Sequence, residues 1–220
     1  MKAARAFYTD ILGEQFWDSA GINIAPLPAR AAAAGAPAHW LGHISVGDIE
    51  GTVDNVMTLG GEQLGPSQRG PDGSQRAILR DPFGAVLAVT SETADADRSP
   101  VVWHLHHSQD QERSFYWYAG LFGWAPTEAV DLGSELGAHQ MFTWNESRRP
   151  VGSMANTARL PQIHPQWLFF FRVADIASSL VKVRALGGIA LAPVRTSLDD
   201  ILAPCDDPQG AAFGLYQYGL

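Results

Sequence analysis

The sequence predicts an α+β fold built from repeated βαβββ units, and three observations support this prediction. When segments 40–66 and 167–193 are aligned at a constant offset, ten positions hold the same residue in both. Each segment combines a strand-like apolar run with a helical apolar stripe. Each repeat then closes with an Asp-Pro-x-Gly turn, at Asp81 and at Asp207. A repeated supersecondary unit explains all three observations.

Each repeat begins with a strand that leads into a capped helix. Residues 40–46 and 167–173 are rich in apolar and aromatic side chains, which predicts strands. Asp48 and Asp175 follow them at the N-cap position, where a carboxylate accepts the free N–H groups of a first helical turn. We therefore expect a helix after each aspartate.

The two expected helices carry an apolar stripe and end at paired glycines. Spacings of four and three residues place the apolar side chains on one helix face. These side chains are Ile49, Val53 and Val56 in the first repeat and Ile176, Leu180 and Val183 in the second. Gly60-Gly61 and Gly187-Gly188 then supply a residue with positive φ. Short strands follow, and the Asp-Pro-x-Gly turn starts the last one, because proline presets φ and glycine relieves the turn.

A fainter relation lies upstream of each repeat. Residues 7–17 resemble residues 117–126, and both have the pattern of an amphipathic helix that ends at a glycine, Gly13 or Gly123. In the second half we expect a strand before this helix and three strands after it. These predicted strands include residues 101–108, 139–145 and 150–154.

The first half is an incomplete copy of the second. It begins almost at its helix, so the preceding strand is missing, and its connection contains a flexible-looking tract at 28–38. We expect an incomplete domain at 1–94, which lacks its first strand, and a complete domain at 98–220. The polar segment 91–100 would link them.

Composition and charge exclude several functional classes. The net charge is −8 and Lys and Arg are not clustered, which argues against nucleic acid or an anionic membrane as the main partner. The single cysteine, Cys205, excludes an intramolecular disulfide and a Cys-rich zinc site. We see no run of about 20 apolar residues and no secretory signal. We therefore expect a cytoplasmic protein.

The combination of motifs resembles the vicinal oxygen chelate superfamily, which includes glyoxalase I, bleomycin-resistance proteins and extradiol dioxygenases. The resemblance is carried by WYAGLFGW (117–124), by the Trp and Asp that lead into ALGG (185–188), and by the two Asp-Pro-x-Gly turns. The resemblance covers nearly the whole chain and is strongest to paired-domain, glyoxalase-like proteins. It implies paired βαβββ units whose curved mixed sheets form a cup. It does not imply one reaction, because this fold carries isomerases, lyases, epimerases, oxygenases and metal-free binders.

The resemblance also implies where metal ligands would stand. In the second domain these positions hold Trp103, Leu168 and Gly214, and in the first domain the remaining two hold Leu41 and Ala88. A metal site needs about three convergent N or O donors, and none of these side chains is a metal ligand. We therefore predict neither a metal nor another cofactor.

A histidine cluster offers a further hypothesis. His104, His106 and His107 lie on one expected strand, where alternation sends the first two to one face and His107 to the other. The resemblance implies that Trp103, Leu105 and His107 face the cup. His107 is then a candidate general base or ligand donor, because imidazole titrates near neutral pH. The simpler interpretation is that all three are partly buried, hydrogen-bonded histidines.

The cup of the second domain is the predicted binding site. Aromatic strand residues can line a pocket for a planar ligand, with a guanidinium for an anionic group, although a packed core uses the same aromatics. The predicted ligand-binding residues are Trp103, Leu105, His107, Trp144, Leu168, Phe170, Arg172, Gly214 and Tyr216.

These features favour a metal-free member of the superfamily that binds a small organic molecule, with or without turnover. One alternative is a metal-dependent lyase or dioxygenase that uses the region of His104, His106 and His107. Another is a structural or regulatory module, because loss of the first strand exposes a sheet edge and favours a homodimer.

Overall fold

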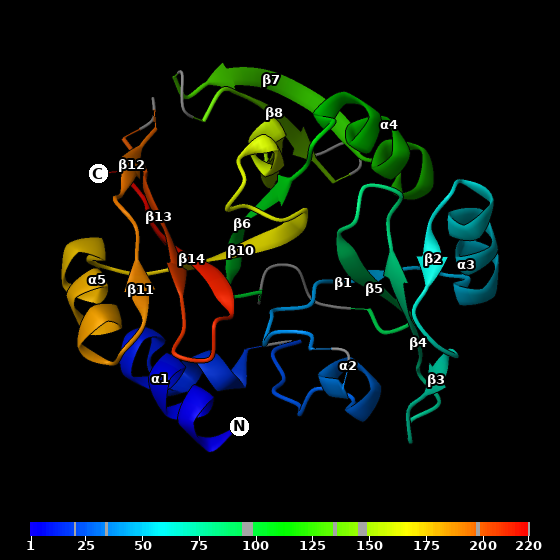
Figure 1. Cartoon of the computed structure of the whole chain (residues 1–220), viewed down its shortest axis with the longest axis horizontal. Helices are drawn as coiled ribbons and strands as arrows, with labels where there is room; N and C mark the ends of the chain where they lie inside the picture. Colours follow the sequence, from blue (N-terminus) through cyan, green and yellow to red (C-terminus); the bar gives the residue numbers. More distant parts are fainter. Residues whose placement is uncertain are drawn as a thin grey trace. The chain divides into compact units, whose positions relative to one another are not determined.

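The computed structural model describes residues 1–19, 21–33, 35–93, 99–133, 136–144, 149–196 and 199–219. Its helices and strands form two compact units, each built from both halves of the chain (Figure 1). Unit 1 comprises Met1–Trp40, Ala94–Trp103 and Leu168–Leu220, and unit 2 comprises Leu41–Thr93 and His104–Trp167. Each compact unit therefore combines segments from both of the domains expected at 1–94 and 98–220.

Unit 1 combines the first helix of the chain with the last βαβββ repeat. Its helical elements are α1 (Lys2–Leu12), η1 (Glu14–Asp18), α2 (Ala29–Ala33) and α5 (Ile176–Ala185). Its strands are β10 (Gln166–Arg172, from Leu168 onward), β11 (Ile189–Ala190), β12 (Val194–Arg195), β13 (Ile201–Asp206) and β14 (Ala212–Gln217). The strand order is β11-β13-β14-β10, with β12 paired to β13. The sheet is mixed, because β10 and β14 run parallel while β13 and β14 run antiparallel.

The core of unit 1 lies between α1, η1 and α5 and one face of this sheet (Figure 1). Phe7 of α1 meets Phe213 of β14 with 5.9 Å between the ring centroids, and Phe16 meets Phe171 of β10 at 5.2 Å. Phe171 and Phe213 are fully buried. Burial of such aromatic side chains is the main stabilising contribution here.

Unit 2 holds the other repeat together with the strand-helix segment of the second half. One set of elements is β1 (His43–Ser45), α3 (Ile49–Thr58), β2 (Glu62–Gln63), β3 (Gln68–Arg69), β4 (Gln75–Arg80) and β5 (Val86–Thr90). The other is β6 (Val101–His107, from His104 onward), α4 (Gln111–Phe122), β7 (Ala125–Asp131), β8 (Ala138–Thr143), β9 (Gly152–Ala155) and η3 (Asn156–Arg159). The strand orders are β1-β5-β4-β2, with β3 on β4, and β6-β9-β8-β7.

The local features expected from the sequence are present. The Asp48 carboxylate accepts a hydrogen bond from Gly51 N at 3.0 Å, and Asp175 accepts one from Ser178 N at 3.1 Å, so both aspartates cap their helices. Gly60 and Gly187 have φ values of 85° and 87° and end these helices. The fold class is α+β with curved mixed sheets, as predicted.

Two local expectations need correction. The strand expected at 40–46 is limited to His43–Ser45, the residues that pair with β5. The tract at 28–38, expected to be flexible, contains the short helix α2. Its run of alanines explains this, because alanine has the highest helix propensity. Part of the expected linker at 91–100 lies outside the described residues.

No helix among the described residues has the length and apolar character needed to cross a membrane.

Candidate functional site

The predicted site residues of unit 1 share one face of its sheet. Side chains alternate along β10, so Leu168, Phe170 and Arg172 point away from the core face that Phe171 occupies. Phe170 pairs with Gly214 and Arg172 with Tyr216 on β14, and laterally paired residues point to the same side. Trp103 joins this surface through its ring, whose centroid lies 6.4 Å from that of Tyr216. We call this surface the β10–β14 face.

The three superfamily metal positions lie on the β10–β14 face, and their side chains do not fit a metal ion. Trp103 offers only an N–H donor, and Leu168 offers no polar atom. Gly214 has no side chain, and a Cβ added there would overlap the ring of Phe170. The space that a ligand side chain at position 214 would need is therefore filled. Among the described residues, no group of three or more His, Cys, Asp or Glu side chains is placed to hold a metal.

An aromatic cluster with one exposed cation forms the end of this face. The guanidinium carbon of Arg172 lies 5.3 Å from the centroid of the Tyr218 ring, which itself lies 5.0 Å from the ring of Tyr216. The Tyr216 hydroxyl donates to the Asp200 carboxylate, which fixes its ring. Arg172 is exposed, whereas Tyr216 is buried. The arrangement can stack a planar group and pair its anion with a guanidinium.

The histidines of β6 alternate between two faces of unit 2, as predicted. His106 is fully buried against α4, and its Nε2 lies 3.2 Å from Asp81 Oδ2. His104 Nδ1 is 2.9 Å from the carbonyl oxygen of Val151, and burial lowers its pKa to about 4. His107 lies on the opposite face, with its Nδ1 2.6 Å from Thr157 Oγ1. The three rings therefore do not converge on one point, which does not favour a metal centre in this region.

His107 has the properties of a hydrogen-bonding group. Burial lowers its pKa to about 3, and the neighbouring His106 and His139 add to the lowering. The imidazole is then unprotonated at neutral pH and is a weak base, which argues against a general-base role. Leu105 is buried on the same face of β6.

Trp144 lies apart from the other predicted site residues of unit 2. Its ring centroid is 5.2 Å from that of His104 and 4.7 Å from that of Trp124. Trp124 stacks on Tyr118 of α4, so Trp144 belongs to the aromatic layer on the helix side of the sheet. It does not share a face with His107.

A repeated buried network was not expected from the sequence. In unit 2 the Tyr118 hydroxyl donates to Asp81 Oδ2 at 2.8 Å and accepts from Trp167 Nε1 at 2.9 Å. The matching residues of unit 1 are Tyr8, Asp207 and Trp40, with distances of 3.1 and 2.8 Å. Burial raises the pKa of Tyr118, with a contribution from the Asp81 charge. In the sequence, this network is indicated only by two separate similarities: one between the helices that contain Tyr8 and Tyr118, and one between the two Asp-Pro-x-Gly turns.

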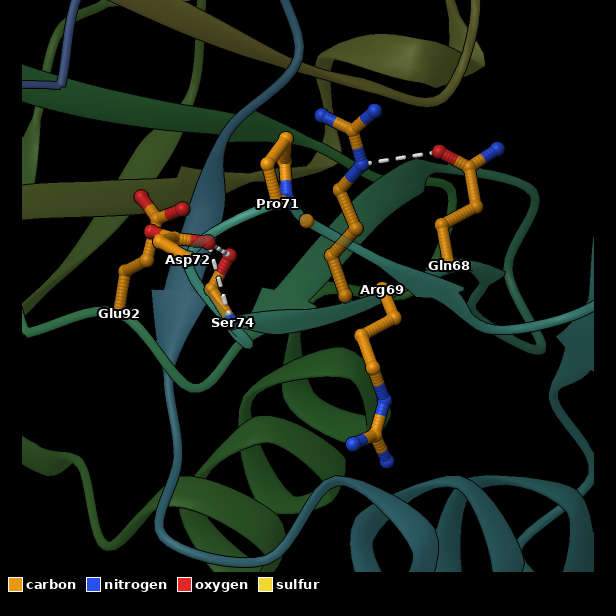
Figure 2. A pocket seen from close by; sticks show the side chains of 8 residues that line it. Gln68, Arg69, Pro71, Asp72, Ser74 and Glu92 are labelled. Carbon is orange, nitrogen blue, oxygen red and sulfur yellow. Dashed lines mark hydrogen bonds between the residues drawn. The ribbon is translucent and has the colours of Figure 1, made fainter.

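A surface cavity of about 440 Å³ lies at the β3–β4 hairpin of unit 2 (Figure 2). Asp72, Ser74 and Glu92 lie on one side of it and Gln68 on the other. Arg76 Nε donates to Gln68 Oε1 at 2.9 Å, and Ser74 Oγ donates to Asp72 at 2.7 Å. These exposed polar side chains largely satisfy one another, so the cavity does not present a dedicated site.

Comparisons with known proteins agree with the fold. No protein-family model matches the chain. The "Putative glyoxylase CFP32" of Mycobacterium bovis is 24% identical over 97% of this chain and 88% of its own length. A variant of homoprotocatechuate 2,3-dioxygenase from B. fuscum has a TM-score of 0.65 and 14% identity, over 100% of this chain and 68% of that chain. A Mn(II)-bound glyoxalase from Novosphingobium aromaticivorans has a TM-score of 0.56 and 11% identity, over 80% of this chain.

The structure has the glyoxalase/dioxygenase fold. The chain spans 60% of the Novosphingobium glyoxalase, so it is shorter than that protein. The chain is similar in sequence to a glyoxylase-like relative, and it shares its fold with glyoxalases and extradiol dioxygenases.

Proposed function

We propose that this protein binds a small, planar, anionic organic molecule on the β10–β14 face, and that it does so without a metal. One observation carries the proposal: the exposed Arg172 guanidinium lies over the Tyr218 ring, and the rings of Tyr216 and Trp103 continue the aromatic cluster from there. The superfamily metal positions on the same face supply no donor set. Binding would then depend on stacking and on charge-assisted hydrogen bonds.

The relatives suggest a probe. The dioxygenase from B. fuscum was solved in complex with HPCA, its homoprotocatechuate ligand. This compound is a planar ring with a carboxylate, which suits an aromatic surface beside a guanidinium. With about 12 non-hydrogen atoms at about 0.4 kcal/mol each, we expect a dissociation constant of about 100–300 µM.

The test is a calorimetric titration of homoprotocatechuate into protein that has been treated with a chelator. We expect saturable binding at the same affinity before and after chelation. Arg172→Gln should weaken binding about tenfold or more, because it removes one charge-assisted hydrogen-bonding group. Arg30→Gln is the matched control, since Arg30 is an exposed arginine of α2 in the same unit.

Three results would contradict the proposal. One is the absence of saturable binding to the folded protein. A second is equal weakening by Arg172→Gln and Arg30→Gln. The third is binding that disappears on chelation and returns with added Mn(II), which would favour the metal-dependent alternative.

A further inference from the structure

A polar surface lies on the sheet of β1, β5 and β4 in unit 2, on the side away from α3. Ala88 of β5 pairs with His43 of β1, and Thr90 of β5 stands between Ser45 of β1 and Arg76 of β4. Laterally paired residues point to the same side, and strand alternation puts all five residues on one face. We call this surface the β1–β4 face. It belongs to a different sheet from the β10–β14 face.

The internal repeat shows what distinguishes His43. His43 and Ala88 stand in the same register as Phe170 and Gly214 of the β10–β14 face. Phe170 is buried and fills the space beside Gly214. His43 is exposed, so its imidazole does not fill a core and is accessible to a ligand.

The cationic groups of this face have few partners. Arg76 also lines the cavity at the β3–β4 hairpin, where its Nε donates to Gln68 Oε1 at 2.9 Å. Within the part of the chain that the structure describes, the two terminal nitrogens of Arg76 and both ring nitrogens of His43 have no hydrogen-bond partner. Arg80 on the same strand is different, because its Nη1 lies 2.6 Å from Glu62 Oε2. The donors of Arg76 and His43 are therefore available to an anion.

The charges of the two groups interact across β5. Partial loss of hydration lowers the pKa of His43, the positive charge of Arg76 on β4 adds to the lowering, and the negative charge of Glu92, just after β5, opposes it. Arg76 and a protonated His43 repel each other. An anion between them would remove this repulsion and accept hydrogen bonds from both.

We propose that the β1–β4 face binds an oxyanion, the phosphate group or carboxylate of a small molecule, between Arg76 and His43. The planar guanidinium offers two parallel N–H donors that match two oxygens of such a group, and the imidazole adds a third donor. This site lies on its own sheet and does not depend on the ligand proposed for the β10–β14 face.

The test is an NMR titration of the full chain at constant ionic strength, observing the Arg76 Nε–H and the His43 ring. Sulfate represents a phosphate group, because its charge does not change near neutral pH, and acetate represents a carboxylate. We expect saturable shifts at both residues, with a dissociation constant of about 1–10 mM for probes of some four or five non-hydrogen atoms.

Two variants on the face and two controls locate the site. Arg76→Gln should weaken sulfate binding about tenfold, and Glu92→Gln should tighten it about two- to threefold by removing an opposing charge. The matched control is Arg69→Gln, because Arg69 is an exposed arginine of the same hairpin that pairs with Gln75 and so points to the other side. Neither Arg69→Gln nor Arg172→Gln should change sulfate affinity.

The contribution of His43 is tested by pH. Protonation adds a positive charge to the imidazole, so sulfate should bind about threefold or more tightly at about pH 5 than at about pH 7.5. His43→Gln should remove this pH dependence, whereas His164→Gln, which changes another exposed histidine of unit 2, should preserve it.

The relative affinity of the two probes identifies the ligand group: tighter sulfate binding supports a phosphate group, and tighter acetate binding supports a carboxylate. No saturable shift with either probe up to about 100 mM would overturn the proposal. Equal weakening by Arg76→Gln and Arg69→Gln would also overturn it, as would a sulfate affinity whose pH dependence is the same in the parent and in His43→Gln.

Discussion

Gly214→Ala is the substitution that most directly examines the packing of the β10–β14 face. Gly214 does not require a left-handed backbone, so alanine meets no conformational barrier there. A Cβ at this position would, however, overlap three atoms of the Phe170 ring, which is only 2% exposed. The ring must therefore shift within a packed environment.

The expected cost follows from two opposing effects. Overpacking of a well-packed core costs about 1–3 kcal/mol. Replacing a strand glycine with alanine recovers about 0.5–1 kcal/mol by reducing the entropy of the unfolded chain. Because the added Cβ would overlap three atoms of a buried ring, we take the upper part of the first range, about 2–3 kcal/mol. The net loss is then about 1–2.5 kcal/mol, which corresponds to a fall in melting temperature of about 2–10 °C for a chain of this length.

The assay is thermal and urea unfolding of four proteins: the parent, Gly214→Ala, Phe170→Leu and the double variant. Leucine lacks the ring atoms that Cβ would overlap, so the double variant should lose less stability than the sum of the singles, by about 0.5–3 kcal/mol. Gly120→Ala in α4 is the control, because its added Cβ meets open space and should not destabilise. A neutral Gly214→Ala, or additive effects in the double variant, would refute the packing argument.

Three further predictions concern stability and assembly. Tyr118→Phe removes the hydroxyl that joins Asp81 to Trp167. Urea unfolding should show a loss of about 1–3 kcal/mol in unfolding free energy. A loss below about 0.5 kcal/mol would mean that the network does not stabilise unit 2. Burial lowers the pKa of His107 to about 3 in the folded protein, so below about pH 6.5 the unfolded chain binds a proton that the folded protein does not. As the pH is lowered through this range, the unfolding free energy should fall by up to about 1.4 kcal/mol per pH unit for this group. His107→Gln should flatten that dependence in pH-dependent melting curves, and an unchanged slope would contradict the assignment. Finally, we expect a homodimer, and light scattering at micromolar concentration that shows only monomer would oppose it.

The sequence predicts those parts of the fold that depend on neighbouring residues. The caps at Asp48 and Asp175 and the positive φ at Gly60 and Gly187 follow from interactions within a few positions of the chain. Strand alternation likewise predicts that Phe170, Arg172 and their neighbours on β14 share one face, once the strands are assigned.

The remaining features depend on contacts between distant segments. His107 and His139 lie on the same face because both pair with β9, the strand between them. Their position on one face therefore depends on the register of three strands. Trp144 follows the end of β8, where alternation no longer determines direction, and it packs with Trp124 instead. The network of Asp81 and Tyr118 joins residues from the two halves of the chain, which no local pattern reveals.

The most direct test of the central claim is the titration of homoprotocatechuate into metal-stripped protein, with metal content measured by elemental analysis in the same samples. The account predicts saturable binding that is independent of metal content and weakened by Arg172→Gln. Binding that appears only in proportion to bound metal, and that Arg172→Gln leaves unchanged, would contradict it.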